Sequence, residues 1–284
     1  MILSRKPRKA AEDYERTMLP QTRREVFLDI LKLQWSKLLR LGLILFVSAI
    51  PLLMVAIYED SYFLAVTENA DVLREEVPAL FSPFRIFCDL LRIPCIVVFF
   101  IGLSGVVRAL RQLAWGENVT VLHDFTVGLR QNWKQFLAVG LVYGLCHALA
   151  MTGWHNSLTA GGGNVWIWGV ILGLLLFLVM PVVCCAAVIV AIYNNSLTDD
   201  LRIAAFIYLK APVKTVGAML AAFAVCLIIW QIPSLWLHII LSIPAMAVFV
   251  LGFLGWLLFV CGQLDRYYND EHYPELVGKG IGGR

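Results

Sequence analysis

The sequence predicts an all-α integral membrane protein with six transmembrane helices arranged as three hairpins. Hydrophobic residues make up 60% of its 284 residues, charged residues make up only 15%, and the mean hydropathy is +0.77. A soluble domain of this length cannot bury so much apolar surface. Charged residues are absent from 135–198 and from 215–264, and the continuous apolar run at 171–190 favours helices over the alternating strands of a barrel. Lipid is therefore the expected solvent.

The apolar runs divide into six spans, because about 20 helical residues cross a hydrocarbon core roughly 30 Å thick. The first span follows the charged N-terminal segment, and the second ends near Arg108, where charge returns to the chain. The first charge-free stretch holds the third and fourth spans, separated by a turn at the three glycines 161–163, and the second holds the fifth and sixth. The predicted spans are 39–58, 93–110, 136–152, 165–193, 216–230 and 241–263.

Each hairpin is preceded by a charged amphipathic segment, which we expect to form a helix on the cytoplasmic side. Trp35 and Trp133 each stand seven residues before a glycine, Gly42 and Gly140, whereas the third segment has Lys210 at the equivalent place. An interfacial tryptophan keeps its ring in an apolar layer and its N–H near water. Such a helix serves either as a lipid anchor or as a docking surface for a partner, and the sequence favours the lipid anchor.

Basic residues predict a multi-pass protein of the cell membrane with both ends in the cytoplasm, since Lys and Arg of short loops stay on that side. Twenty of the 23 basic residues lie before the first span, in the loops after the second and fourth spans, or in the tail. The outer loop at 59–91 is acidic. We divide the chain into a basic segment (1–26), one six-helix domain (27–264) and a tail (265–284), and the long charged segment at the start argues against a cleaved signal peptide.

No pattern of residues indicates catalysis, so we expect no enzyme, no cofactor and no metal. The seven cysteines nearly all lie in apolar spans without a C-x-x-C spacing, and the predicted spans contain no facing carboxylates that a proton relay would need. We interpret His147 as a neutral, hydrogen-bonded histidine. The glycine-rich tail at 278–283 follows no strand, which predicts a flexible terminus and no phosphate site. The net charge of +3 belongs to a basic membrane side, which meets anionic lipid, and predicts no nucleic-acid binding.

Four short runs resemble one known family. They are Leu103-Ser104-Gly105-Val106-Val107-Arg108, Gly116-Glu117-Asn118-Val119, Asp124-Phe125 and Asn132-Trp133-Lys134-Gln135. Together they are similar to the YesL-like bacterial membrane proteins, a family of unknown function, and the resemblance covers roughly 27–265. Because members are often encoded beside carbohydrate uptake systems, the resemblance implies an accessory role in sugar import.

Our leading hypothesis is a noncatalytic membrane component that acts through partner proteins, such as a membrane transporter complex. The candidate partner or lipid interface consists of Trp35, Asp124, Asn132, Trp133 and Lys134, because the distinctive residues lie there and not within the spans. The alternative is a carrier or permease for an uncharged or lipidic small molecule, which the repeated hairpins and proline-interrupted spans favour. Self-association into a homo-oligomer stays open.

Overall fold

The structure is a computed structural model that describes residues 19–68, 77–159, 164–193, 195–230 and 235–282. Within these ranges all regular elements are helical. The long elements are α1 (Arg23–Glu68), α2 (Val77–Ala114), α3 (Val121–Thr159), α4 (Val165–Leu174), η2 (Leu175–Val179), α5 (Met180–Ile192), α6 (Leu197–Lys210), α7 (Pro212–Trp230) and α8 (Leu235–Leu264). Three short elements follow: η3 (Asp265–Asn269), α9 (Asp270–His272) and η4 (Pro274–Leu276). The glycine turn expected at 161–163 lies outside the described residues.

Five described helices are long and apolar enough to cross a membrane, which confirms the multi-span, all-helical prediction in its coarse form. The path α4–η2–α5 forms one of them over Val165–Ile192, where a π-helical turn directly precedes Pro181. A sixth span exists only if α6 and α7 are counted together, although they bend by 103° at their junction. Ala211 and Pro212 form that junction, and proline cannot continue the hydrogen-bond pattern of a preceding helix.

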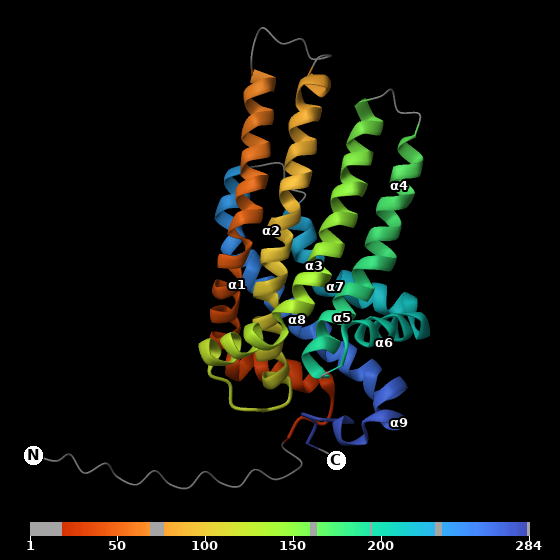
Figure 1. Ribbon diagram of the computed structural model, residues 1–284. Coiled ribbons are helices and arrows are strands. Elements are labelled where there is room, and N and C mark those ends of the chain that lie inside the picture. Colours follow the sequence, from red (N-terminus) through yellow and green to blue (C-terminus); the bar gives the residue numbers. More distant parts are fainter. Residues whose placement is uncertain (1–18, 69–76, 160–163, 194, 231–234, 283–284) are drawn as a thin grey trace, which may run out of the picture.

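The expected outer loop at 59–91 is instead mostly helical. Helix α1 continues to Glu68 as one helix of 46 residues, and α2 begins at Val77. In Figure 1 the upper ends of α1 and α2 stand beyond those of α3 and α4. The prediction was wrong because it treated each charge as the end of a span, whereas these charges are paired between helices, as described below.

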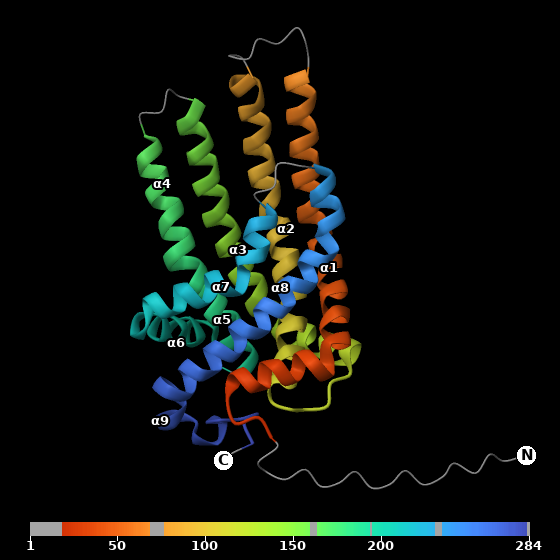
Figure 2. The same ribbon diagram turned by 180° about the vertical axis from the view of Figure 1, so that it is seen from behind.

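The helices form an upright bundle with a layer of short, transverse segments at its lower end. Figures 1 and 2 show the starts of α1 and α3, and all of α6, running across that end. Helix α8 crosses the bundle obliquely and packs on α1 and α7 (Figure 2). Trp256 of α8 is completely buried and donates its Nε1–H to the Cys184 carbonyl of α5 over 2.9 Å, which joins these helices in the core.

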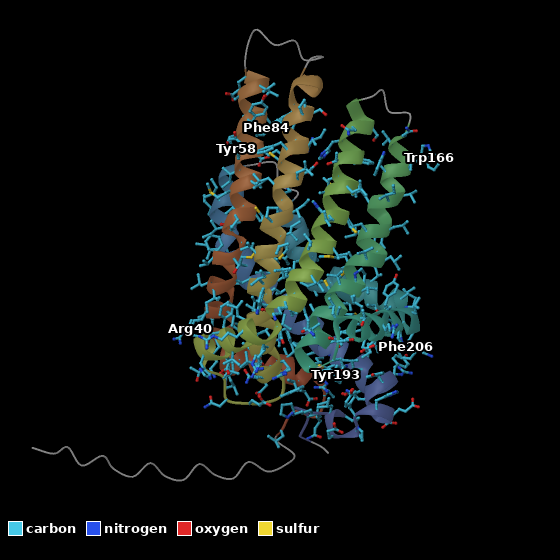
Figure 3. All side chains as sticks on the ribbon, in the orientation of Figure 1. Arg40, Tyr58, Phe84, Trp166, Tyr193 and Phe206 are labelled. Atoms are coloured by element: carbon cyan, nitrogen blue, oxygen red, sulfur yellow. The ribbon has the colours of Figure 1, made fainter. Side chains whose placement is uncertain are left out.

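The lower end, called the basic end hereafter, carries the exposed side chains of Arg40, Lys134 and Lys210. Figure 3 places Arg40 there and Tyr58 and Phe84 near the opposite end. Glu59 follows Arg40 by 19 positions along α1, which at about 1.5 Å per residue is roughly 28 Å. This distance is close to the thickness of a hydrocarbon core.

Candidate functional site

Three of the five predicted interface residues have accessible side chains at the basic end. Trp35 on α1 is 57% exposed, and Trp133 on α3 is 40% exposed. Lys134 is also exposed, and its Nζ lies 5.8 Å from the centre of the Trp133 ring. The neighbouring Asn132 is half-buried. The α3 segment thus presents an aromatic ring beside a positive charge, a pair suited to headgroups or to an acidic partner.

Asp124 does not belong to this accessible surface. Its side chain is buried, its Oδ2 accepts a hydrogen bond from the Thr120 N–H at 2.7 Å, and its own N–H donates to the Thr120 carbonyl at 2.9 Å. A carboxylate at this place is also stabilised by the positive end of the α3 helix dipole. Asp124 therefore fixes the start of α3 and orients the segment that presents Trp133.

Large apolar side chains are exposed beside the charged residues of the same end. The most exposed are Leu33 (69%), Leu122 (67%), Leu209 (71%) and Val213 (84%). They come from the starts of α1, α3 and α7 and from α6. Apolar residues alternating with basic ones suit a surface that lies against lipid headgroups or against another protein.

A buried charge network, missed at the sequence level, joins α1, α2 and α3 near the opposite end. Arg92 donates to Asp89 Oδ1 over 2.8 Å and also to Glu59 Oε2. Asp89 Oδ2 lies 3.1 Å from His155 Nδ1, and Arg85 Nε lies 2.9 Å from Glu59 Oε1. The side chains of Glu59, Asp89 and His155 are at least nine-tenths buried, whereas Arg85 is 39% exposed. Each of the three helices therefore contributes at least one member.

The network has a balanced charge when His155 is neutral, because two arginines face two carboxylates. An ionised Asp89 can only accept, so the proton of His155 is assigned to Nδ1. Buried ion pairs cost desolvation energy, yet losing one member leaves the others unpaired at a greater cost. Ionisable groups that are buried among apolar helices are candidates for a functional site. The network is thus a rigid link between three helices and a second candidate site.

His147 lies two helical turns from His155 on α3. Its Nδ1 is buried and has no hydrogen-bond partner in the described structure, which differs from the hydrogen bond expected for this residue. Its ring instead lies 6.2 Å from that of Tyr143, centre to centre.

The sequence contains a partial signal for the charge network. Asp89 and Arg92 are three residues apart and therefore share a helical face.

Asp200 is a buried carboxylate in the first turn of α6, outside the spanning helices. It is completely buried, and neither oxygen makes a hydrogen bond of ordinary geometry among the described residues. Burial raises its pKa to about 6, which the Asn195 side chain opposes and the Asp199 charge supports. The raised pKa means that this carboxyl group still holds its proton at mildly acidic pH, because burial disfavours its charged form.

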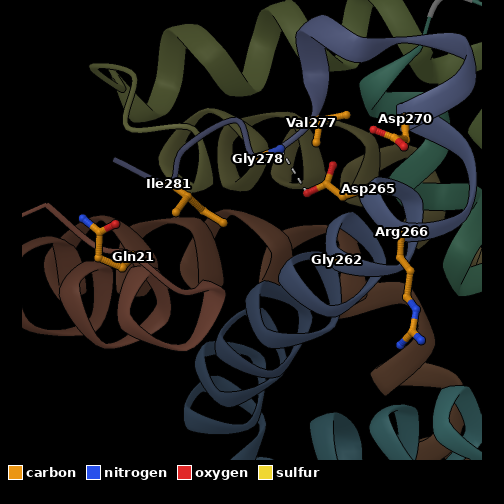
Figure 4. Close-up of a pocket in the computed structure, with 8 residues that line it drawn as sticks. All are labelled: Gln21, Gly262, Asp265, Arg266, Asp270, Val277, Gly278 and Ile281. Atoms are coloured by element: carbon orange, nitrogen blue, oxygen red, sulfur yellow. Dashed lines mark hydrogen bonds between the residues drawn. The ribbon is translucent and has the colours of Figure 1, made fainter. Parts of the chain in front are cut away.

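The C-terminal tail packs against the basic end, contrary to the expected flexible terminus. The Arg23 guanidinium donates to the Lys279 carbonyl over 2.7 Å and to Asp265 Oδ2 over 2.6 Å. The Gly282 N–H donates to the Pro20 carbonyl over 2.9 Å. A pocket of about 550 Å³ remains beside the tail (Figure 4). Its lining comprises Gln21, Gly262, Asp265, Arg266, Asp270, Val277, Gly278 and Ile281.

Comparison with known proteins gives no match to the chain. No family model, no curated protein and no solved structure matches it. The similarity to YesL-like proteins therefore stays a prediction. The function has to be argued from the two ends of the bundle: the exposed aromatic and basic surface at one end and the buried charge network toward the other.

Proposed function

We propose that this chain is a noncatalytic membrane protein that acts through a partner protein docked at its basic end, which faces the cytoplasm. The observation that carries the proposal is the pairing of exposed Trp133 and Lys134 on a segment that Asp124 holds in place. Tryptophan is among the residues that contribute most to the binding energy of interfaces, and an already ordered backbone lowers the entropic cost of binding. Trp35 extends the same kind of surface onto α1.

The proposed partner is a membrane transport complex, with this chain as an accessory or regulatory subunit. Two considerations support it. The runs at 103–108, 116–119 and 132–135 resemble the YesL-like family, whose members accompany carbohydrate uptake systems. In addition, a tightly paired charge network between α1, α2 and α3 suits a rigid subunit better than a solute pathway.

The Trp133→Ala and Lys134→Ala double variant is expected to lower recovery of the partner at least about tenfold, because it removes both halves of the exposed pair. The measurement is quantitative mass spectrometry of proteins co-purified with the tagged chain in mild detergent, at equal amounts of inserted protein. The thermal unfolding midpoint is expected to change little, since both side chains are accessible.

A matched control lies on α6. Phe206 and Lys210 form the same kind of pair, with Lys210 Nζ 5.2 Å from the ring centre, and both are exposed at the basic end. The Phe206→Ala and Lys210→Ala double variant should leave partner recovery unchanged. Equal losses in both double variants would indicate general lipid anchoring and would contradict a docking face on α3.

The second candidate function is a carrier for an uncharged or lipidic small molecule, which the prolines inside α1, α2 and α8 favour. A carrier needs an internal element that can exist in two arrangements, and proline interrupts the hydrogen-bond pattern of a helix. Purified protein in liposomes should then move a sugar or lipid probe. Wild-type liposomes that transport none of the probes would exclude this candidate.

A further inference from the structure

The C-terminal tail lies in a surface groove at the basic end with a fit that depends on its glycines. A Cβ atom on Gly280 would come within 2.1 Å of the Ala114 carbonyl oxygen at the end of α2, and Gly280 has a φ of +87°. A Cβ atom on Gly282 would come within 2.2 Å of the Leu19 side chain. Between them, Ile281 packs against the main hydrophobic core. Only a segment with small residues at these positions can lie so close to the groove.

Trp115 and Glu117 form a binding position for a lysine side chain in the groove. Lys279 Nζ lies 3.9 Å from the centre of the Trp115 ring and 4.0 Å from Glu117 Oε1. The Arg111 guanidinium lies 4.5 Å from the centre of the same ring and fixes it. An aromatic ring with a carboxylate beside it is a typical receptor for an ammonium group.

The surroundings of the groove are acidic, although the end of the bundle is basic as a whole. Residues 265–276 carry four acidic side chains, Asp265, Asp270, Glu271 and Glu275, against one basic side chain, Arg266. Figure 4 shows Asp265 and Asp270 at the pocket beside the tail, on the side opposite Gln21. Since Asp265 is already paired with Arg23, Asp270 is the acidic side chain of the pocket lining that can attract a basic segment.

We propose that this groove is a peptide-binding site for a basic, glycine-containing segment of the partner, and that residues 277–282 of the chain occupy it until the partner displaces them. The inference rests on the proposed function, because it requires a partner at the basic end. The pocket beside the tail is lined in part by Asp270 and Arg266, which offer further contacts to a longer segment. Those contacts matter, because a tethered tail competes at an effective concentration of about millimolar.

The test uses the full chain in nanodiscs and a fluorescent peptide with the sequence of residues 277–284. Wild-type protein should bind it weakly, because its own tail fills the groove. Gly280→Ala should release the tail, so that trypsin cleaves after Lys279 at least about tenfold faster and the peptide binds at least about tenfold tighter. Gly173→Ala is the matched control, since a Cβ atom there meets nothing within 4 Å.

Two further variants define the outcome. Trp115→Ala added to Gly280→Ala should abolish peptide binding, and a peptide with glutamate in place of its lysine should not bind. Equal binding of both peptides, or equal affinity in wild-type and Gly280→Ala proteins, would overturn the proposal. Tighter peptide binding after removal of residues 1–18 would identify that basic segment as the occupant and would also overturn it. The assay contains no partner, so its result is independent of the Trp133 and Lys134 experiment.

Discussion

Replacing Arg92 by alanine is expected to lower the free energy of unfolding by about 3–5 kcal/mol, the range for breaking a buried ion pair by removing one member. The Arg92 side chain is only 11% exposed and bonds to both Glu59 and Asp89. Without it, two neighbouring carboxylates stay buried, with the partly exposed Arg85 as the remaining arginine of the network. Unfolding by SDS in mixed micelles, followed by circular dichroism, measures the loss.

A control and a rescue distinguish lost pairing from lost packing. Arg202→Ala removes an arginine that is 82% exposed and lies 3.5 Å from Asp199, so the change should stay below about 1 kcal/mol. Adding Glu59→Gln and Asp89→Asn to Arg92→Leu should recover most of the stability, because the one charge of the network that then lacks its partner, on Arg85, is 39% exposed to solvent. A loss below about 1 kcal/mol for Arg92→Ala would show that water reaches the network.

The coarse fold could be predicted from the sequence because hydropathy acts locally. The fourth span, expected at 165–193, corresponds to the helical path Val165–Ile192, and α3 contains all of the third. The charge network could not be predicted in the same way. Glu59 and Arg92 are 33 residues apart, and charges near the end of an apolar run normally mark a membrane boundary. Their pairing depends on how α1 packs against α2, which no local pattern gives.

The candidate sites show the same division between local and tertiary information. Trp133 is expected at an interface because it precedes Gly140 in a charged amphipathic segment, and its side chain on α3 is 40% exposed. Asp124 has the polarity of an interface residue, yet its carboxylate closes the start of its own helix. From composition alone, Gly280 indicates a flexible tail. In the structure, the absence of a Cβ atom on Gly280 lets the tail backbone lie against the Ala114 carbonyl.

Asp200→Asn is expected to stabilise the protein by about 2–3 kcal/mol at pH 7.5 and to have little effect at pH 4. The pKa of this carboxyl lies at about 6 in the folded state against an ordinary value of 3.8. Folding therefore favours its protonated form, and the stability it contributes below about pH 4 is lost as the pH rises through 6. About two units of pKa correspond to roughly 3 kcal/mol, which is the upper end of the expected effect for this buried side chain.

The measurement is the unfolding midpoint of wild-type and variant proteins between pH 4 and pH 8. Wild-type stability should fall across the interval from 4 to 6 relative to the variant, and the two curves should then run parallel. Asp199→Asn is the control, because the side chain of this neighbour is 53% exposed, it stays able to bond Ser196, and its charge is the smallest of the causes that act on the pKa of Asp200. A variant less stable than wild type at pH 7.5 would mean that the Asp200 carboxylate is ionised and paired in the membrane-bound protein. In that case the group would strengthen the packing of α6 instead of opposing it.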